Sequence, residues 1–166
     1  MGKLQHYSLD YNIAVVNVQN SLDLKAAYIN HQIQFESHCN VIAVGRLFKS
    51  GKFIATCGRL TDEPSKLDCK ELSTSNCKIS KVGIGGPLVD SDGYFVGMNF
   101  YDEEVTPFLP RDIIIECLRN FETGTISAEN TDRTPNRCPF QHSSHILTDG
   151  QCLNRIGLIR QILQMT

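Results

Sequence analysis

The stretch Val82-Gly83-Ile84-Gly85-Gly86-Pro87-Leu88-Val89-Asp90 decides the fold of this 166-residue chain. Its glycines predict a tight turn, and the apolar residues after Pro87 predict a strand. Asp90-Ser91-Asp92-Gly93 follows and predicts a hairpin turn, because Asp-Gly accepts the positive φ angles that tight turns require. A returning strand is expected over 94–101. Turn, strand, hairpin and strand in succession indicate an antiparallel β protein.

The rest of the first 110 residues repeats this pattern of short apolar runs and turns. We predict strands at 11–18, 41–46 and 52–60, shorter extended stretches at 67–72 and 76–82, and a turn at Ser50-Gly51. Residues 106–110 are interpreted as an irregular connector. Residues 112–121 predict a helix, because their apolar side chains recur at helical spacing. The fold class expected is mainly β, a barrel or sandwich.

Composition limits the classes of protein to consider. The hydrophobic share of 41% suits a globular chain with one core. The formal net charge of −2 gives no electrostatic argument for nucleic acid or an anionic membrane, and neither is an expected partner. No apolar run is long enough for a membrane helix, and the first residues lack the apolar stretch of a signal peptide. Seven cysteines without a secretory address predict reduced thiols, with a cytoplasmic or nuclear location by default. No cofactor is expected.

Residues 82–99 resemble the nucleophile loop of trypsin-like serine peptidases, most closely the HtrA/Deg group. That loop runs Gly-Asn-Ser-Gly-Gly-Pro-Leu-Val, then a short Asp-Gly turn, then a strand with Gly-Ile/Met-Asn, which here is Gly97-Met98-Asn99. Residues 11–18 are similar to the family strand Asp-Ile-Ala-Val-Leu-Lys-Val, residues 41–58 to the strand pair that opens the second barrel, and residues 106–121 to the closing stretch and helix.

This resemblance covers roughly residues 8–121 and implies a trypsin-like (chymotrypsin-fold) antiparallel β-barrel. It implies a remnant of the first barrel at 1–21 and the second barrel with its closing helix at 22–121. Residues 122–166 are expected to form a polar linker and a short amphipathic helix, outside the resemblance.

The same resemblance implies a catalytically degenerate, truncated homologue. Peptidase chemistry in this family needs a serine nucleophile, a histidine base and an orienting aspartate. Ile84 falls on the nucleophile position and Asn12 on the aspartate position. Only eleven residues precede Asn12, and the one histidine among them is His6, which lies too near to occupy the family's histidine position. The oxyanion turn, Val82-Gly83-Ile84-Gly85-Gly86, has backbone N–H donors, so we expect a similar turn to persist.

We therefore expect a non-catalytic homologue that serves as a peptide- or protein-binding module. The strand after the nucleophile helps to line the family's substrate cleft, so Asn99, Phe100, Tyr101 and Asp102 are the candidate residues for binding an extended chain by strand addition. Two alternatives stay open. One is a serine-type endopeptidase with a rearranged site, and the other is a truncated gene product that folds poorly.

Other side chains favour a structural interpretation over a chemical one. Ser75, Cys77 and Ser80 precede the turn as ordinary strand residues, and the neighbours His38 and Cys39 are expected on opposite faces. Cys138, His142, His145 and Cys152 match no standard zinc spacing, so no metal is predicted. The acidic residues at 90, 92 and 102–104 are expected as turn formers, because they lack the ligand pattern of a calcium loop. The apolar stripe at 153, 156, 159 and 163 is interpreted as a packing face.

Overall fold

A computed structural model of the protein describes residues 2–18, 29, 34–67 and 69–123. Its elements, in chain order, are β1 (Gly2–Ser8), β2 (Ile13–Val18), β3 (Asn40–Arg46), β4 (Phe53–Thr61), β5 (Ser73–Ser75), the 3-10 turn η1 (Lys81–Gly83), β6 (Pro87–Asp90), β7 (Phe95–Asn99), β8 (Thr106–Pro110) and α1 (Arg111–Glu122). Among the described residues, no helix has the length and apolar character to cross a bilayer. The linker and helix expected after α1, with the four zinc candidates, lie outside the described residues.

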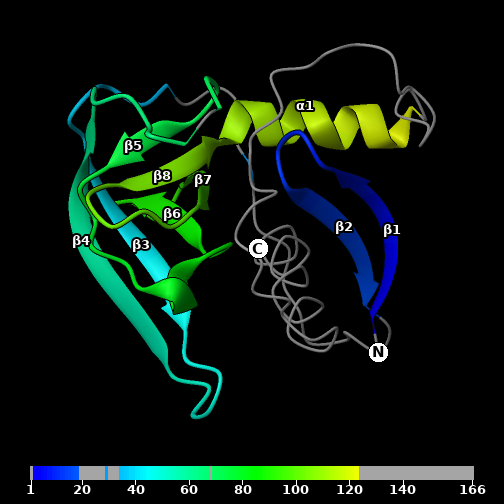
Figure 1. Ribbon diagram of the computed structural model, residues 1–166, viewed down its shortest axis with the longest axis horizontal. Helices are drawn as coiled ribbons and strands as arrows, with labels where there is room; N and C mark the ends of the chain where they lie inside the picture. Colours follow the sequence, from blue (N-terminus) through cyan, green and yellow to red (C-terminus); the bar gives the residue numbers. More distant parts are fainter. Residues whose placement is uncertain (1, 19–28, 30–33, 68, 124–166) are drawn as a thin grey trace.

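Six strands form a closed antiparallel barrel in the order β3-β4-β5-β8-β7-β6 (Figure 1). The barrel closes where β3 pairs with β6, through Val41 opposite Asp90 and Ala43 opposite Leu88. Its interior is filled by strand side chains and by Cys77, which lies after β5; the strand residues are Val41, Ala43, Leu88, Val96 and Phe108. The mainly β class expected from the sequence is confirmed.

A separate two-stranded sheet, β1 with β2, lies beside the barrel and is joined to it through α1 (Figure 1). Ile13 of β2 shares a buried cluster with Ile114, Cys117 and Phe121 of the helix, and Leu109 of β8 belongs to the same cluster. The ring of His6 on β1 also stacks on Phe121, with centroids 5.4 Å apart and planes inclined by 12°. The helix therefore packs against both sheets.

Residues 106–110 were expected as an irregular connector and are instead strand β8, so that prediction is wrong. The two prolines explain both the expectation and the outcome. The carbonyl of Pro107 accepts the N–H of Phe100 at 2.7 Å. A strand residue directs its nitrogen and its carbonyl to the same neighbour, so the Pro107 nitrogen faces Phe100, which lies beyond Asn99 and Phe108, the last register pair of β7 and β8.

Neither of the two extended stretches expected at 67–72 and 76–82 forms a strand within the described residues. The strand in this region is β5, which lies between them, and 81–83 is a 3-10 turn. Thr74 and Ser75 of β5 are polar yet buried. The hydroxyl of Thr74 donates to the Glu63 carbonyl at 2.6 Å, which makes this burial tolerable. A pattern search that seeks apolar residues misses such a strand.

Candidate functional site

The glycine turn is compact and satisfies its own amides. The N–H of Gly83 donates to the Ser80 carbonyl at 2.8 Å, and the N–H of Gly86 donates to the Gly83 carbonyl at 3.0 Å. The N–H of Ile84, at the nucleophile position, donates to the Lys81 carbonyl at 3.4 Å. An oxyanion hole needs donors directed at the developing charge. These amides instead close the turn.

Three hydrogen bonds attach the turn to the end of β7. The N–H of Gly85 donates to the Asn99 carbonyl at 2.8 Å, and the N–H of Asn99 donates to the Gly86 carbonyl at 2.9 Å. The side-chain amide of Asn99 donates to the Pro87 carbonyl at 3.1 Å. Asn99 is fully buried. Its backbone and its amide nitrogen therefore hold the turn, and its side chain is not open to a ligand.

The turn also lies directly against β3. A Cβ built on Gly86 would overlap the carbonyl oxygen of Val44, and one on Gly45 would lie 3.0 Å from both the Gly83 Cα and the Val82 carbonyl oxygen. Gly85 has a φ of 73°, in the left-handed region. These glycines are thus required by backbone packing and turn geometry, whether or not chemistry occurs beside them.

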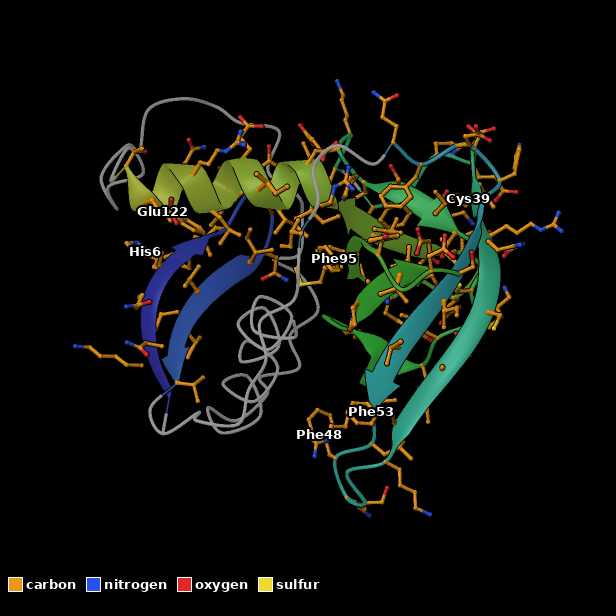
Figure 2. The ribbon with its side chains drawn as sticks, turned by 180° about the vertical axis from the view of Figure 1, so that it is seen from behind. His6, Cys39, Phe48, Phe53, Phe95 and Glu122 are labelled. Atoms are coloured by element: carbon orange, nitrogen blue, oxygen red, sulfur yellow. The ribbon has the colours of Figure 1, made fainter. Side chains whose placement is uncertain are left out.

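The structure does not bring the triad positions into one catalytic arrangement. Ile84 is half-buried in the barrel turn, while Asn12 is an exposed residue of the β1–β2 turn with a φ of 50°. Asparagine tolerates that angle better than most residues, which gives Asn12 a structural role there. His6 stacks on Phe121, and Figure 2 places His6 beside the end of the helix near Glu122. The other histidine within the described ranges, His38, pairs with Asp62 at 3.3 Å on the surface.

Cys39 and Cys77, which were considered as replacement nucleophiles, and Cys117 are not activated. Burial raises the pKa of Cys77, which is fully buried in the barrel. Burial, with Asp90 and Glu36 adding to it, also raises the pKa of Cys39. In the helix, burial raises the pKa of Cys117 to about 11. A thiol with a raised pKa stays protonated at neutral pH and is a poor nucleophile.

The residues before the glycine turn and the acidic residues of the hairpin turn occupy positions that the fold explains. Ser75 is fully buried in β5, whereas Cys77 and Ser80 lie after that strand and outside any other. The Asp90 carboxylate accepts the N–H groups of Asp92 and Tyr94 at 3.0 and 2.8 Å, as expected of a turn former.

The candidate peptide-binding segment begins where β7 ends. Phe100 uses its N–H in the bond to Pro107. In the described part of the chain, no hydrogen bond involves the backbone of Tyr101, which is half-buried. The Asp102 carboxylate accepts the N–H of Glu104 at 3.2 Å. Of the four residues expected to bind a peptide, Tyr101 and Asp102 therefore have no backbone hydrogen bond within the described part of the chain, and Tyr101 lies nearer to β7.

Two lysines, Lys66 and Lys78, bind the loop that carries Tyr101. Lys78 donates to the Glu104 carbonyl at 2.6 Å, and Lys66 forms an ion pair with the Glu104 carboxylate. The hydroxyl of Thr106 donates to the Cys77 carbonyl. The bonds of Lys78 and Cys77 join the segment that precedes the glycine turn to the segment that follows β7. No sequence motif marks them, because the partners lie 26 to 38 residues apart.

A closed six-stranded antiparallel barrel, a glycine turn held to its fifth strand in space and a C-terminal helix together define a trypsin-like fold. No protein-family model matches the sequence, and no curated protein does. Among solved structures, the chain is similar to the apo form of the MamO protease domain from Magnetospirillum magneticum, with 20% identity and a TM-score of 0.57.

The similarity covers 70% of this chain and 66% of the MamO chain, so the chain spans just under two thirds of that structure's length. Likeness at this identity shows the fold alone. It confirms the predicted trypsin-like class, while the closer relation to the HtrA/Deg group and the loss of catalysis stay predictions.

Proposed function

We propose that this chain is a non-catalytic trypsin-like protein that binds an extended peptide or protein segment beside its glycine turn. The observation that carries the proposal is the backbone of Tyr101, whose N–H and carbonyl have no hydrogen bond within the described ranges. Tyr101 closely follows Asn99, which holds the turn that has Ile84 in place of a nucleophile. An extended chain could pair with these groups as an added strand.

The non-catalytic part of the proposal is supported by the side chains around the turn. Isoleucine has no atom that can attack a carbonyl or carry an acyl group. The N–H of Ile84 is bonded to Lys81 within the turn. The histidines of the described ranges, His6 and His38, are engaged elsewhere, and neither contacts the turn.

The binding part is supported by the fixed loop around Tyr101. The contacts of Lys66 and Lys78 with Glu104 hold the loop, so little conformational freedom is lost when a partner pairs with it. Preorganisation of this kind favours affinity, because the ordering cost is met before binding.

Replacing Tyr101 by proline is expected to weaken peptide binding about tenfold, because it removes the N–H that an added strand would use. Tyr101→Ala is the matched control, since it shortens the side chain and keeps the N–H. We would follow amide shifts on titration with a library of unfolded peptides, and check each variant by thermal unfolding. Amide shifts that stay unchanged over 82–101 in the native chain would reject the proposal.

Ile84→Ser is expected to restore no peptidase activity, because no described histidine is placed to take the serine proton. Labelling with a fluorophosphonate probe tests both the native chain and the variant. Covalent labelling of the native chain would favour the alternative, a serine endopeptidase with a rearranged site.

A sharp, cooperative thermal transition of the native chain would argue against a poorly folding gene product.

A further inference from the structure

The β3–β4 hairpin carries two exposed aromatic rings at its tip. The tip is Arg46-Leu47-Phe48-Lys49-Ser50-Gly51-Lys52-Phe53. Figure 1 shows this hairpin extending beyond the barrel, and Figure 2 places Phe48 and Phe53 together at its end. Phe48 is 57% exposed and Phe53 is 74% exposed. Rings of this size are usually buried, so their joint exposure on a projecting turn points to an interaction surface.

The same hairpin is strongly basic. Between Glu36 and Asp62 the chain contains four cationic side chains and no acidic one, and the cations are Arg46, Lys49, Lys52 and Arg59. The whole chain nevertheless has a formal charge of −2. Positive charge is therefore concentrated on this hairpin, although the net charge of the whole chain is close to zero.

The tip is an ordered turn. Gly51 has a φ of 68°, its N–H donates to the Leu47 carbonyl at 2.8 Å, and the N–H of Leu47 donates to the Lys52 carbonyl at 2.9 Å. The side chain of Arg46 donates to the Gly51 carbonyl at 3.1 Å, and its guanidinium lies 5.5 Å from the centre of the Phe53 ring. These contacts and the turn place Arg46, Lys49 and Lys52 at the same end of the hairpin as the two rings, whereas Arg59 lies at the other end, opposite Asn40.

We propose that this tip docks on the surface of an anionic lipid bilayer. Phe48 and Phe53 would enter the interfacial layer, where aromatic side chains are favoured, and Lys49 and Lys52 would lie at the level of the anionic headgroups. This departs from the expectation that a membrane is not a partner. An acidic protein would also attract the cations, but two rings on a projecting tip suit a deformable surface better than a rigid one. Binding of this kind needs both the charges and the apolar groups.

Sedimentation with phosphatidylcholine vesicles containing about a quarter phosphatidylserine tests the proposal. The full chain is expected to bind these vesicles at low salt, to be released at about 0.5 M salt, and to ignore pure phosphatidylcholine. Lys49→Glu/Lys52→Glu is expected to weaken binding at least about 25-fold, since each cation contributes about fivefold. Phe48→Ala/Phe53→Ala is expected to weaken it at least about tenfold.

Two matched controls distinguish the tip from the surface in general. Lys3→Glu/Lys70→Glu makes the same change in net charge at exposed sites elsewhere, and Leu9→Ala/Tyr94→Ala removes apolar side chains that are 73% and 42% exposed. Neither is expected to lower vesicle binding appreciably. Equal losses in the tip variants and these controls would overturn the proposal.

Insertion can be observed directly, because the chain contains no tryptophan. In Phe53→Trp, the indole emission is expected to shift to the blue on addition of anionic vesicles and to be quenched by nitroxide-labelled lipid. Tyr94→Trp, on the β6–β7 hairpin, is the control and is expected to show neither change. Unchanged Phe53→Trp emission would overturn the proposal, as would binding to polyglutamate without binding to vesicles, which would indicate an acidic protein partner. None of these outcomes depends on peptide binding at Tyr101.

Discussion

Gly86→Ala is expected to unfold the barrel, with a loss of more than about 4 kcal/mol in the free energy of unfolding. The new Cβ would overlap the Val44 carbonyl oxygen and lie 3.0 Å from the Gly83 carbonyl oxygen. Both are backbone atoms, so neither can rotate away as a side chain would. Relief requires β6 to move from β3, and that pairing closes the barrel. Urea unfolding followed by circular dichroism measures the effect.

Gly93→Ala is the control for this prediction. A Cβ at Gly93 meets nothing within 4 Å, and the substitution is strained only by the φ of 87°. We expect it to cost about 1–2 kcal/mol, the usual cost of a left-handed angle in a residue with a Cβ. Gly86, unlike Gly93, has no positive φ, so similar losses in the two variants would contradict the prediction that the close approach to Val44 dominates.

Asn99→Asp is expected to lower the free energy of unfolding by about 3–5 kcal/mol at about pH 7, because it places an uncompensated charge in the core. The native amide nitrogen donates to the Pro87 carbonyl at 3.1 Å, and Asn99 is fully buried. An ionised carboxylate has no proton to donate and would face that carbonyl oxygen. The native side chain already contains one buried acceptor without a hydrogen-bond partner in the described structure, namely Asn99 Oδ1. The substitution would replace the only donor of this side chain with a second such acceptor.

The free energy of unfolding of Asn99→Asp is expected to fall as pH rises. Burial and the facing carbonyl are expected to raise the pKa of the new carboxyl in the folded state above its unfolded value of about 3.9. At pH below about 3.9 both states are protonated and the penalty is small. As pH rises, the unfolded state loses its proton first, so stability falls until the folded carboxyl also ionises.

Asn99→Ala removes the same hydrogen bond without adding a charge, so its stability loss should be the same from about pH 3 to about pH 7. A loss in Asn99→Asp that is equally constant over this range would contradict the explanation given for it.

Local chemistry allowed part of the fold to be predicted from the sequence. The β6–β7 hairpin follows from Asp90-Ser91-Asp92-Gly93, because the Asp90 carboxylate binds two amides of its own turn. The helix follows from the spacing of Ile114, Cys117 and Phe121, which are buried together on one face. These features depend on residues that are near one another in the chain.

Features that depend on distant partners were not predictable. Strand β1 is exposed along most of its length, so it has no apolar pattern and is defined by its pairing with β2. Thr74 is polar and yet buried, because its hydroxyl donates a hydrogen bond to the Glu63 carbonyl in the loop after β4. Asn99 was expected to bind a peptide, and its role in holding the glycine turn becomes visible only when the turn and β7 are seen together.

The glycine turn has a consequence for how chains of this kind change over evolutionary time. Gly86 is required by its contact with β3, and Gly85 by its left-handed angle, and neither requirement involves Ile84. Folding alone is therefore enough to retain Gly85 and Gly86, whichever residue stands before them. A search that detects peptidases by this glycine pair therefore detects the turn of the barrel, whereas the reaction depends on the residue before the pair and on its histidine and aspartate partners.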